Sequence, residues 1–331
     1  MVESYRTSVT LARSRLISEF HRLPGNLGTV AASHYLNRNG CDRTWPMLSE
    51  YAPWVLSDYL SIEPTDQFPN LALSWMLLNA HVLFTDDMLD LPVLTYRSEL
   101  LLSSSLVFQR SLHLMSQLLP DHSAFEAVNK YLTETADAAA IELNQRRSHA
   151  VLRGDLIRPG QKIAFLKICA EIVSVHAGRG PLTKSIQQSL DMLTDGLQIV
   201  DDILDWREDA RAGHLSSLTL STQPDVPTLE DLDLCFLASL ISTEVLEHSI
   251  NRALDYFGAF IDNKRDASRN LVQHVAETRI RITNIKTHCS TIRKTLAELG
   301  ADVDKSLIDY TLKQEILSLD QEIRALAFNS G

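Results

Sequence analysis

The chain has 331 residues, of which 45% are apolar, with 12 glycines and 11 prolines. This composition excludes a fibrous or low-complexity protein and predicts a globular protein that buries a substantial core. The 42 acidic and 31 basic residues give a net charge of −11, which argues against a nucleic acid partner because no net positive field attracts phosphates.

The N-terminal stretch, Met1 to Ile17, lacks the continuous apolar core of a signal peptide. The most apolar window, Leu71 to Phe84, is interrupted by polar residues and predicts no membrane insertion. The four cysteines are scattered, with no CxxC pair and no zinc spacing, so we expect them to be reduced. These features predict a cytoplasmic protein.

Apolar residues recur at helical spacing over nearly the whole chain, and no convincing alternating strand is present. Breaks with proline or glycine fall near residues 119–122, 158–160, 178–181 and 221–227. The pattern predicts an all-α protein of roughly ten or more helices. Because no linker-like composition separates two halves, we expect a single domain over residues 1–331.

Two aspartate triplets lie 115 residues apart, each in an apolar helical stretch. Both read DDxxD, and their members are Asp86, Asp87 and Asp90, and Asp201, Asp202 and Asp205. The first and last carboxylates of each triplet lie one turn apart on one helix face. Carboxylates in apolar surroundings need a cation, and no basic residue lies within four positions of the first triplet. We therefore predict that all six are metal ligands, with Mg²⁺ as the metal.

Two acidic helices that face each other across one apolar cavity suit a ligand with a phosphorylated head and a hydrocarbon tail. Mg²⁺ prefers carboxylate and phosphate oxygens and draws negative charge onto a departing diphosphate. The apolar remainder of the cavity would keep water from a carbocation. A lone DDxxD is more often a solvated acidic helix face, but two copies flanked by apolar residues favour the metal site.

The second motif carries a family resemblance. Gln198 to Asp205 reproduces the FQxxDDxxD signature, with Leu197 in place of the phenylalanine. From about Gly40 to His214 the chain resembles the trans-isoprenyl diphosphate synthase superfamily of class I terpenoid enzymes. The resemblance implies the all-α isoprenoid-synthase bundle around one cavity, a homodimer, and three Mg²⁺ ions over an allylic prenyl diphosphate.

The chain departs from the chain-elongating members of that superfamily where they bind isopentenyl diphosphate. Their GGKRxRP signature corresponds here to Gly40 to Pro46, in which Asp42 replaces the lysine and Trp45 replaces the second arginine. Only Arg43 of the cations is kept.

Further cations of the elongating enzymes are also changed. Thr95 and Tyr96 stand where two arginines follow the first motif, with Arg97 one position beyond. The KT dipeptide is Lys162-Ile163, and the later GK is Gly213-His214. Each lost charge-assisted bond is typically worth about 1.5–3 kcal/mol, so the second diphosphate would bind much more weakly.

An enzyme that ionises an allylic diphosphate without a second substrate must let the cation react with itself. The resemblance therefore implies a terpene synthase that cyclises a linear prenyl diphosphate, with C20 favoured over C15 or C25. A prenyl-diphosphate synthase with a divergent isopentenyl site is the first alternative. A non-catalytic partner subunit is the second, although such a subunit has no need of six carboxylates.

The resemblance also suggests the diphosphate contacts. By position, Arg43 and Lys162 are the best candidates, and Gln198 lies one turn before the second aspartate pair. Arg146 could sense the diphosphate or lie on the surface, and the same two interpretations hold for Arg97. His81 is interpreted as a hydrogen-bonded core histidine.

The aromatic residues near the motifs have two interpretations. They are Trp75, Phe84, Phe108 and Trp206. Their rings could stabilise a carbocation, but aromatics at helical spacing more often belong to the core.

Overall fold

The computed structural model describes residues 2–38, 44–90, 94–119, 122–148, 158–207, 229–263, 269–298 and 310–328. Within these ranges the chain forms twelve α-helices and one short 3₁₀ turn, and no strand. The all-α prediction is therefore confirmed for the part of the chain that the structure describes.

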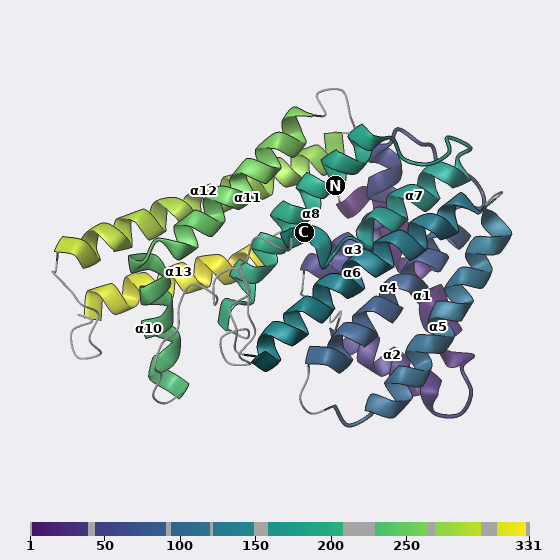
Figure 1. Cartoon of the computed structure of the whole chain (residues 1–331), viewed down its shortest axis with the longest axis horizontal. Helices are drawn as coiled ribbons and strands as arrows, with labels where there is room; N and C mark the ends of the chain where they lie inside the picture. Colours follow the sequence, from purple (N-terminus) through teal and green to yellow (C-terminus); the bar gives the residue numbers. More distant parts are fainter. Residues whose placement is uncertain are drawn as a thin grey trace.

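The helices follow one another in chain order as shown in Figure 1. They are α1 (Val2–His21), α2 (Leu27–Arg38), α3 (Thr44–Tyr59), α4 (Phe68–Asp90), α5 (Arg97–Leu118), α6 (Ser123–Ser148), η1 (Pro159–Gln161), α7 (Leu166–His176), α8 (Lys184–Leu204), α10 (Leu229–Ser242), α11 (Val245–Asp262), α12 (Arg269–Glu298) and α13 (Tyr310–Phe328).

Helix α4 forms the centre of the bundle and positions the first aspartate motif. All eight residues from Leu71 to Leu78 are buried, the polar Ser74 included. A helix that is apolar on every side must be enclosed by others, and α4 packs against α1, α3 and α5. The motif at its C-terminal end therefore starts from a rigid, enclosed element.

A buried carboxylate joins the first three helices. Glu50 of α3 is inaccessible to solvent and accepts a hydrogen bond of 2.8 Å from Tyr35 Oη on α2. Arg13 Nε of α1 donates to both of its oxygens at 3.1 Å. Burial, together with the charge of Glu50, raises the pKa of Tyr35 well above its usual range. Charge-assisted bonds of this kind offset the cost of a buried charge and fix the three helices together.

Helix α8 joins two parts of the molecule that Figure 1 shows side by side. It packs against η1 and α7 on the side of the α1–α7 bundle, and against α11 and α13 on the other side. Helices α10 to α13 form an elongated extension from the bundle (Figure 1). The second aspartate motif, on α8, thus lies where these two parts meet.

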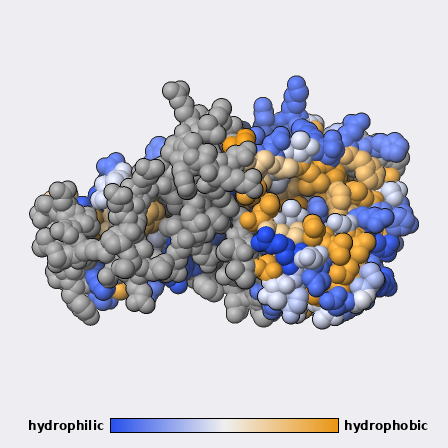
Figure 2. Space-filling model, turned by 60° about the horizontal axis from the view of Figure 1, so that its bottom comes forward, coloured by the Kyte–Doolittle hydropathy of each residue, from blue (hydrophilic) through white to orange (hydrophobic). Residues whose placement is uncertain are grey.

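Apolar side chains are exposed on the surface of the bundle. Figure 2 shows apolar side chains, interspersed with hydrophilic ones, across the described surface of the bundle. The exposed large apolar residues of the chain include Leu101 and Leu102 of α5. Among the described helices, none combines the length and the apolar character that crossing a membrane requires.

Candidate active site

The first aspartate pair lies in the last two turns of α4, with its two carboxylates in different surroundings. Asp86 is exposed, whereas Asp87 is buried with 2% of its surface accessible. His34 Nε2 of α2 hydrogen-bonds Asp87 Oδ2 at 2.7 Å. The side chain of Asp90 lies outside the described residues. Asp86 is therefore directed to solvent while Asp87 is fixed against α2.

The second pair lies at the corresponding end of α8. Asp201 is partly exposed, Asp202 has 9% of its surface accessible, and Asp205 is the exposed C-cap residue. Gln198 Nε2 donates to Asp202 Oδ1 at 3.0 Å and to Asp201 Oδ2 at 3.4 Å. The glutamine that precedes the motif by one turn thus orients both carboxylates of the pair.

The position of these acids at helix C-termini is electrostatically costly. The C-terminal end of a helix carries a partial negative charge, which disfavours carboxylates by about 0.3–1 kcal/mol each at exposed positions. Neither α4 nor α8 has a basic residue in its last turn. Two helices that both end in aspartates create a region of negative potential suited to a cation.

The carboxylates fit Mg²⁺ by their chemistry. Mg²⁺ is usually held by one or two carboxylates together with waters and substrate phosphate oxygens, rather than by a complete protein cage. Among the described residues, no group of three or more His, Cys, Asp or Glu side chains is arranged to hold a metal. A pair of carboxylates such as Asp201 and Asp202 fits this preference, because phosphate oxygens of a substrate would complete the coordination of the metal.

Helix α7 connects the two acidic helices. It packs against α4 and against α8, and its own residues 166–175 are all buried. The predicted cavity between the two aspartate motifs stays a prediction.

The structure describes some of the residues predicted to contact diphosphate. Lys162 directly follows η1 and forms an ion pair with Glu142 of α6. Arg97 is the exposed first residue of α5. Arg43 and the side chain of Arg146 lie outside the described residues. The roles of all four residues stay predictions.

A cluster of charged residues around Arg158 and Lys167 was not predicted from the sequence. Arg158 Nη2 lies 2.9 Å from Asp191 Oδ1 and 3.2 Å from Glu134 Oε1. Lys167 Nζ reaches the same two acids, at 2.7 Å and 3.2 Å. Asp195 completes the cluster, with its Oδ2 3.5 Å from Arg158 Nη1. The i, i+4 spacing of Asp191 and Asp195, upstream of the second motif on α8, was the one signal that could have indicated it.

Three of the four aromatic residues near the motifs are buried, and Phe108 is partly buried against the core. Trp75 and Phe84 are inaccessible to solvent, and Trp206 is 2% exposed. His81 stacks on Phe108 with ring centroids 4.6 Å apart, and its Nδ1 hydrogen-bonds Ser104 Oγ at 2.8 Å. Burial lowers the pKa of His81. His81 is therefore hydrogen-bonded, as predicted, but it is only half-buried.

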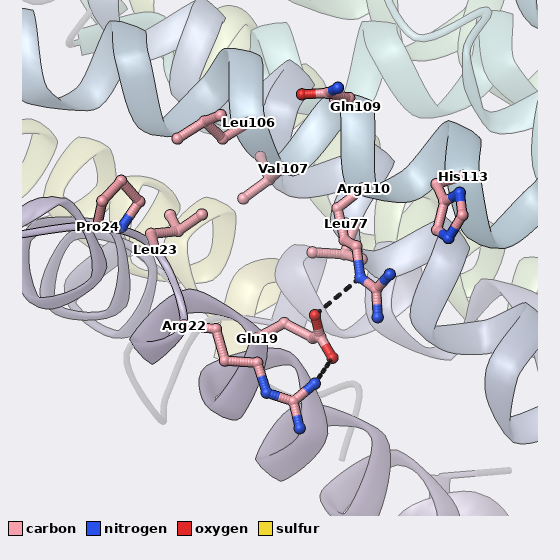
Figure 3. Close-up of a pocket in the computed structure, with 10 residues that line it drawn as sticks. All are labelled: Glu19, Arg22, Leu23, Pro24, Leu77, Leu106, Val107, Gln109, Arg110 and His113. Atoms are coloured by element: carbon pink, nitrogen blue, oxygen red, sulfur yellow. Dashed lines mark hydrogen bonds and ion pairs between the residues drawn. The ribbon is translucent and has the colours of Figure 1, made fainter.

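A separate groove lies between the end of α1 and α5 (Figure 3). Glu19 pairs with two arginines there: its Oε2 lies 3.0 Å from Arg110 Nε across the groove, and its Oε1 contacts Arg22 on its own side. Apolar side chains such as Leu77 and Val107 form part of its wall. None of the ten residues that line this groove belongs to the predicted site.

Comparison with solved structures identifies the fold. A polyprenyl synthase from Caulobacter crescentus CB15, solved in complex with calcium and isoprenyl diphosphate, superimposes with a TM-score of 0.53. The match covers 98% of this chain and 96% of that chain, at 17% sequence identity. This chain has the trans-isoprenyl diphosphate synthase-like fold. No family profile matches the sequence, and no curated protein matches it either.

Proposed function

We propose that this chain is an Mg²⁺-dependent class I terpene synthase. It ionises a linear allylic prenyl diphosphate, with C20 favoured over C15 and C25, and cyclises the resulting carbocation as diphosphate leaves. Because the only bond cleaved to start the reaction is the carbon–oxygen bond to diphosphate, the activity is that of a carbon–oxygen lyase.

One observation carries the proposal: in a polyprenyl synthase-like fold, α4 and α8 both end in aspartate pairs. Asp86 and Asp201 are accessible to a ligand, while Asp87 and Asp202 are held by His34 and Gln198. Bound Mg²⁺ would supply the positive charge that pulls electrons onto the leaving diphosphate. His34 and Gln198 fix the positions of the carboxylate oxygens that would bind the metal.

Cyclisation is favoured over chain elongation because the cations for a second diphosphate are replaced. Thr95 and Tyr96 occupy the exposed turn before α5, where a hydroxyl and a phenol cannot neutralise a diphosphate. Asp42 adds a negative charge where the elongating enzymes have lysine. Repulsion from this charge acts against the substrate that elongation requires.

The apolar interior of the bundle supports carbocation chemistry. Helix α4 contributes an uninterrupted buried stretch, Leu71 to Leu78, two turns before Asp86. Helix α7 adds buried apolar residues, among them Ile168, Ile172 and Val175, beside its charged Lys167 and Glu171. Walls of this kind hold a hydrocarbon tail by burial of apolar surface and keep water from the cation.

The test is an incubation of purified protein and Mg²⁺ with geranyl, farnesyl, geranylgeranyl and geranylfarnesyl diphosphate, each with and without isopentenyl diphosphate. Mass spectrometry of hexane extracts and of the aqueous phase identifies the products. A cyclic hydrocarbon or alcohol from one allylic substrate alone supports the terpene synthase. Longer prenyl diphosphates that form only with isopentenyl diphosphate would replace the proposal with a chain-elongating synthase. No turnover under any condition would favour a non-catalytic partner subunit.

The proposal includes the organisation that the family resemblance implies: one domain over residues 1–331, a cytoplasmic location, and a homodimer. The exposed apolar residues Leu101 and Leu102 of α5 are consistent with a protein–protein contact on the bundle. Light scattering coupled to size-exclusion chromatography measures the mass in solution and tests the homodimer directly.

A further inference from the structure

The turn that presents Lys162 lies directly on the backbone of α8. A Cβ atom on Gly160 would lie 2.5 Å from Thr194 Oγ1 and 2.6 Å from the backbone nitrogen of Asp195. Real Cβ atoms do not approach other atoms so closely, so only glycine permits this contact. The position of the turn is therefore set by α8.

Asp195 fixes the turn through two bonds. Its Oδ1 accepts the backbone N–H of Gly160 at 2.8 Å, and its Oδ2 lies 3.5 Å from Arg158 Nη1. The Asp195 side chain is only 3% exposed. Burial raises its pKa, while Arg158 and the Gly160 N–H act in the opposite direction. A buried carboxylate with these partners holds the turn more firmly than packing alone.

The position of the turn before Lys162 and the position of the second aspartate motif are consequently both set by α8. Asp195 precedes Asp201 by six residues, or about 9 Å along the axis of α8. Lys162 directly follows the turn that Asp195 holds. Lys162 pairs with Glu142 in the structure, so binding of a diphosphate by Lys162 would exchange that ion pair for one with the ligand.

We propose that Asp195 is a positioning residue for Lys162, through its bond to the Gly160 backbone, and so determines how tightly the chain binds the diphosphate of its substrate. The inference rests on the proposed function, because it assumes that Lys162 contacts diphosphate. It assigns a role in substrate binding to a buried acid outside both DDxxD motifs.

The experiment measures binding of inorganic diphosphate in the presence of Mg²⁺ by calorimetry. Asp195→Ala is expected to weaken binding about tenfold, as loss of one well-placed charge-assisted contact would. The matched control is Asp191→Ala, one turn away on α8. It bonds the same Arg158 side chain but not the Gly160 backbone, and we expect binding within twofold of wild type.

A double variant separates positioning from general stability. If Asp195 acts through Lys162, Asp195→Ala causes no further loss of diphosphate binding in a Lys162→Ala background. Hydrogen exchange of the segment 158–165 is expected to speed up in Asp195→Ala and not in Asp191→Ala. If Asp195→Ala does not fold, Gly160→Ala lifts the same turn without changing any charge and is expected to weaken binding similarly.

Three outcomes overturn the inference, and they distinguish failure of the positioning role from failure of the proposed function. Wild-type protein that binds diphosphate, with Asp195→Ala or Gly160→Ala binding equally tightly, removes the positioning role and leaves the proposed function intact. If the losses of diphosphate binding caused by Asp195→Ala and Lys162→Ala add in the double variant, the positioning role is likewise excluded and the proposed function remains. Wild-type protein that binds no diphosphate contradicts the proposed function, and the positioning role fails with it.

Discussion

His34 Nε2 of α2 hydrogen-bonds Asp87 Oδ2 of α4 at 2.7 Å, across 53 positions of sequence. This bond fixes the end of α4 at the point where the first aspartate motif begins. It also gives a partner to a carboxylate that is 2% exposed, and buried charges without partners are costly. The two aspartates of the pair therefore differ in role, since Asp86 remains accessible.

Replacement of His34 by alanine is expected to lower the free energy of unfolding by about 1–3 kcal/mol, because a buried carboxylate loses a bonding partner. Urea denaturation followed by circular dichroism measures the change. The exposed His248 of α11 provides the control, and His248→Ala should remain within about 0.5 kcal/mol of wild type. Equal effects of the two substitutions would show that the bond to Asp87 contributes nothing.

Replacement of Asp201 by asparagine tests the metal site. We expect a loss of about 100-fold or more in kcat/KM with the preferred prenyl diphosphate, because charge stabilisation by a metal is worth several kcal/mol. Mg²⁺ with diphosphate should also raise the Tm of the wild type and not that of the variant. Asp255→Asn, at an exposed position of α11, is the control and should change neither quantity. An Asp201→Asn variant with normal activity would exclude Asp201 as a metal ligand.

Much of the helical architecture follows from local sequence. The predicted break at residues 178–181 separates α7 from α8, and Gly178 and Gly180 adopt positive φ angles of 72° and 70°. Thr183 then caps α8 by accepting the N–H of Ile186 at 3.4 Å. These signals are short-range, because glycine favours the left-handed region and threonine bonds free N–H groups at a helix start.

The candidate site was predictable only where its residues form a motif. The two DDxxD motifs and Gln198 lie within single helices, so their relative positions follow from helical spacing. His34 and Arg158 reach the site region from other elements, through contacts 53 and 37 positions apart in sequence. Charged side chains with such distant partners are indistinguishable from solvated surface residues until the helices are packed.

Close contact between α8 and α11 predicts a strong effect of one added methyl group. A Cβ on Gly196 would lie 2.4 Å from Cε1 of Phe257, whose ring is inaccessible to solvent. We expect Gly196→Ala to lower the free energy of unfolding by about 1–3 kcal/mol through overpacking, despite the better helix propensity of alanine.

The Gly196–Phe257 contact is tested by urea denaturation of a double-mutant cycle. Phe257→Leu makes room for the added methyl group, so the double variant should be more stable than the sum of the single changes predicts. Strict additivity would mean that Gly196→Ala acts through something other than the phenylalanine ring.

The pH dependence of stability should reveal the energetic effect of burying His81. Burial lowers its pKa in the folded protein below the value of 6.5 that applies when it is exposed. Between the folded value and 6.5 the unfolded chain binds more protons, so stability rises with pH in that window. The contribution of neutral His81 is complete above pH 6.5 and is lost as the pH falls through this range.

Urea midpoints of wild type and His81→Gln between pH 7.5 and pH 5 measure this contribution. Glutamine does not titrate and can still bond Ser104 Oγ, so the variant should lose less stability than wild type as the pH falls. His274, whose pKa burial also lowers, is present in both proteins and cancels in the difference. His248→Gln, at an exposed site, should follow the wild-type profile. If His81→Gln also runs parallel to wild type over the whole range, protonation of His81 does not oppose folding and its burial has no energetic consequence.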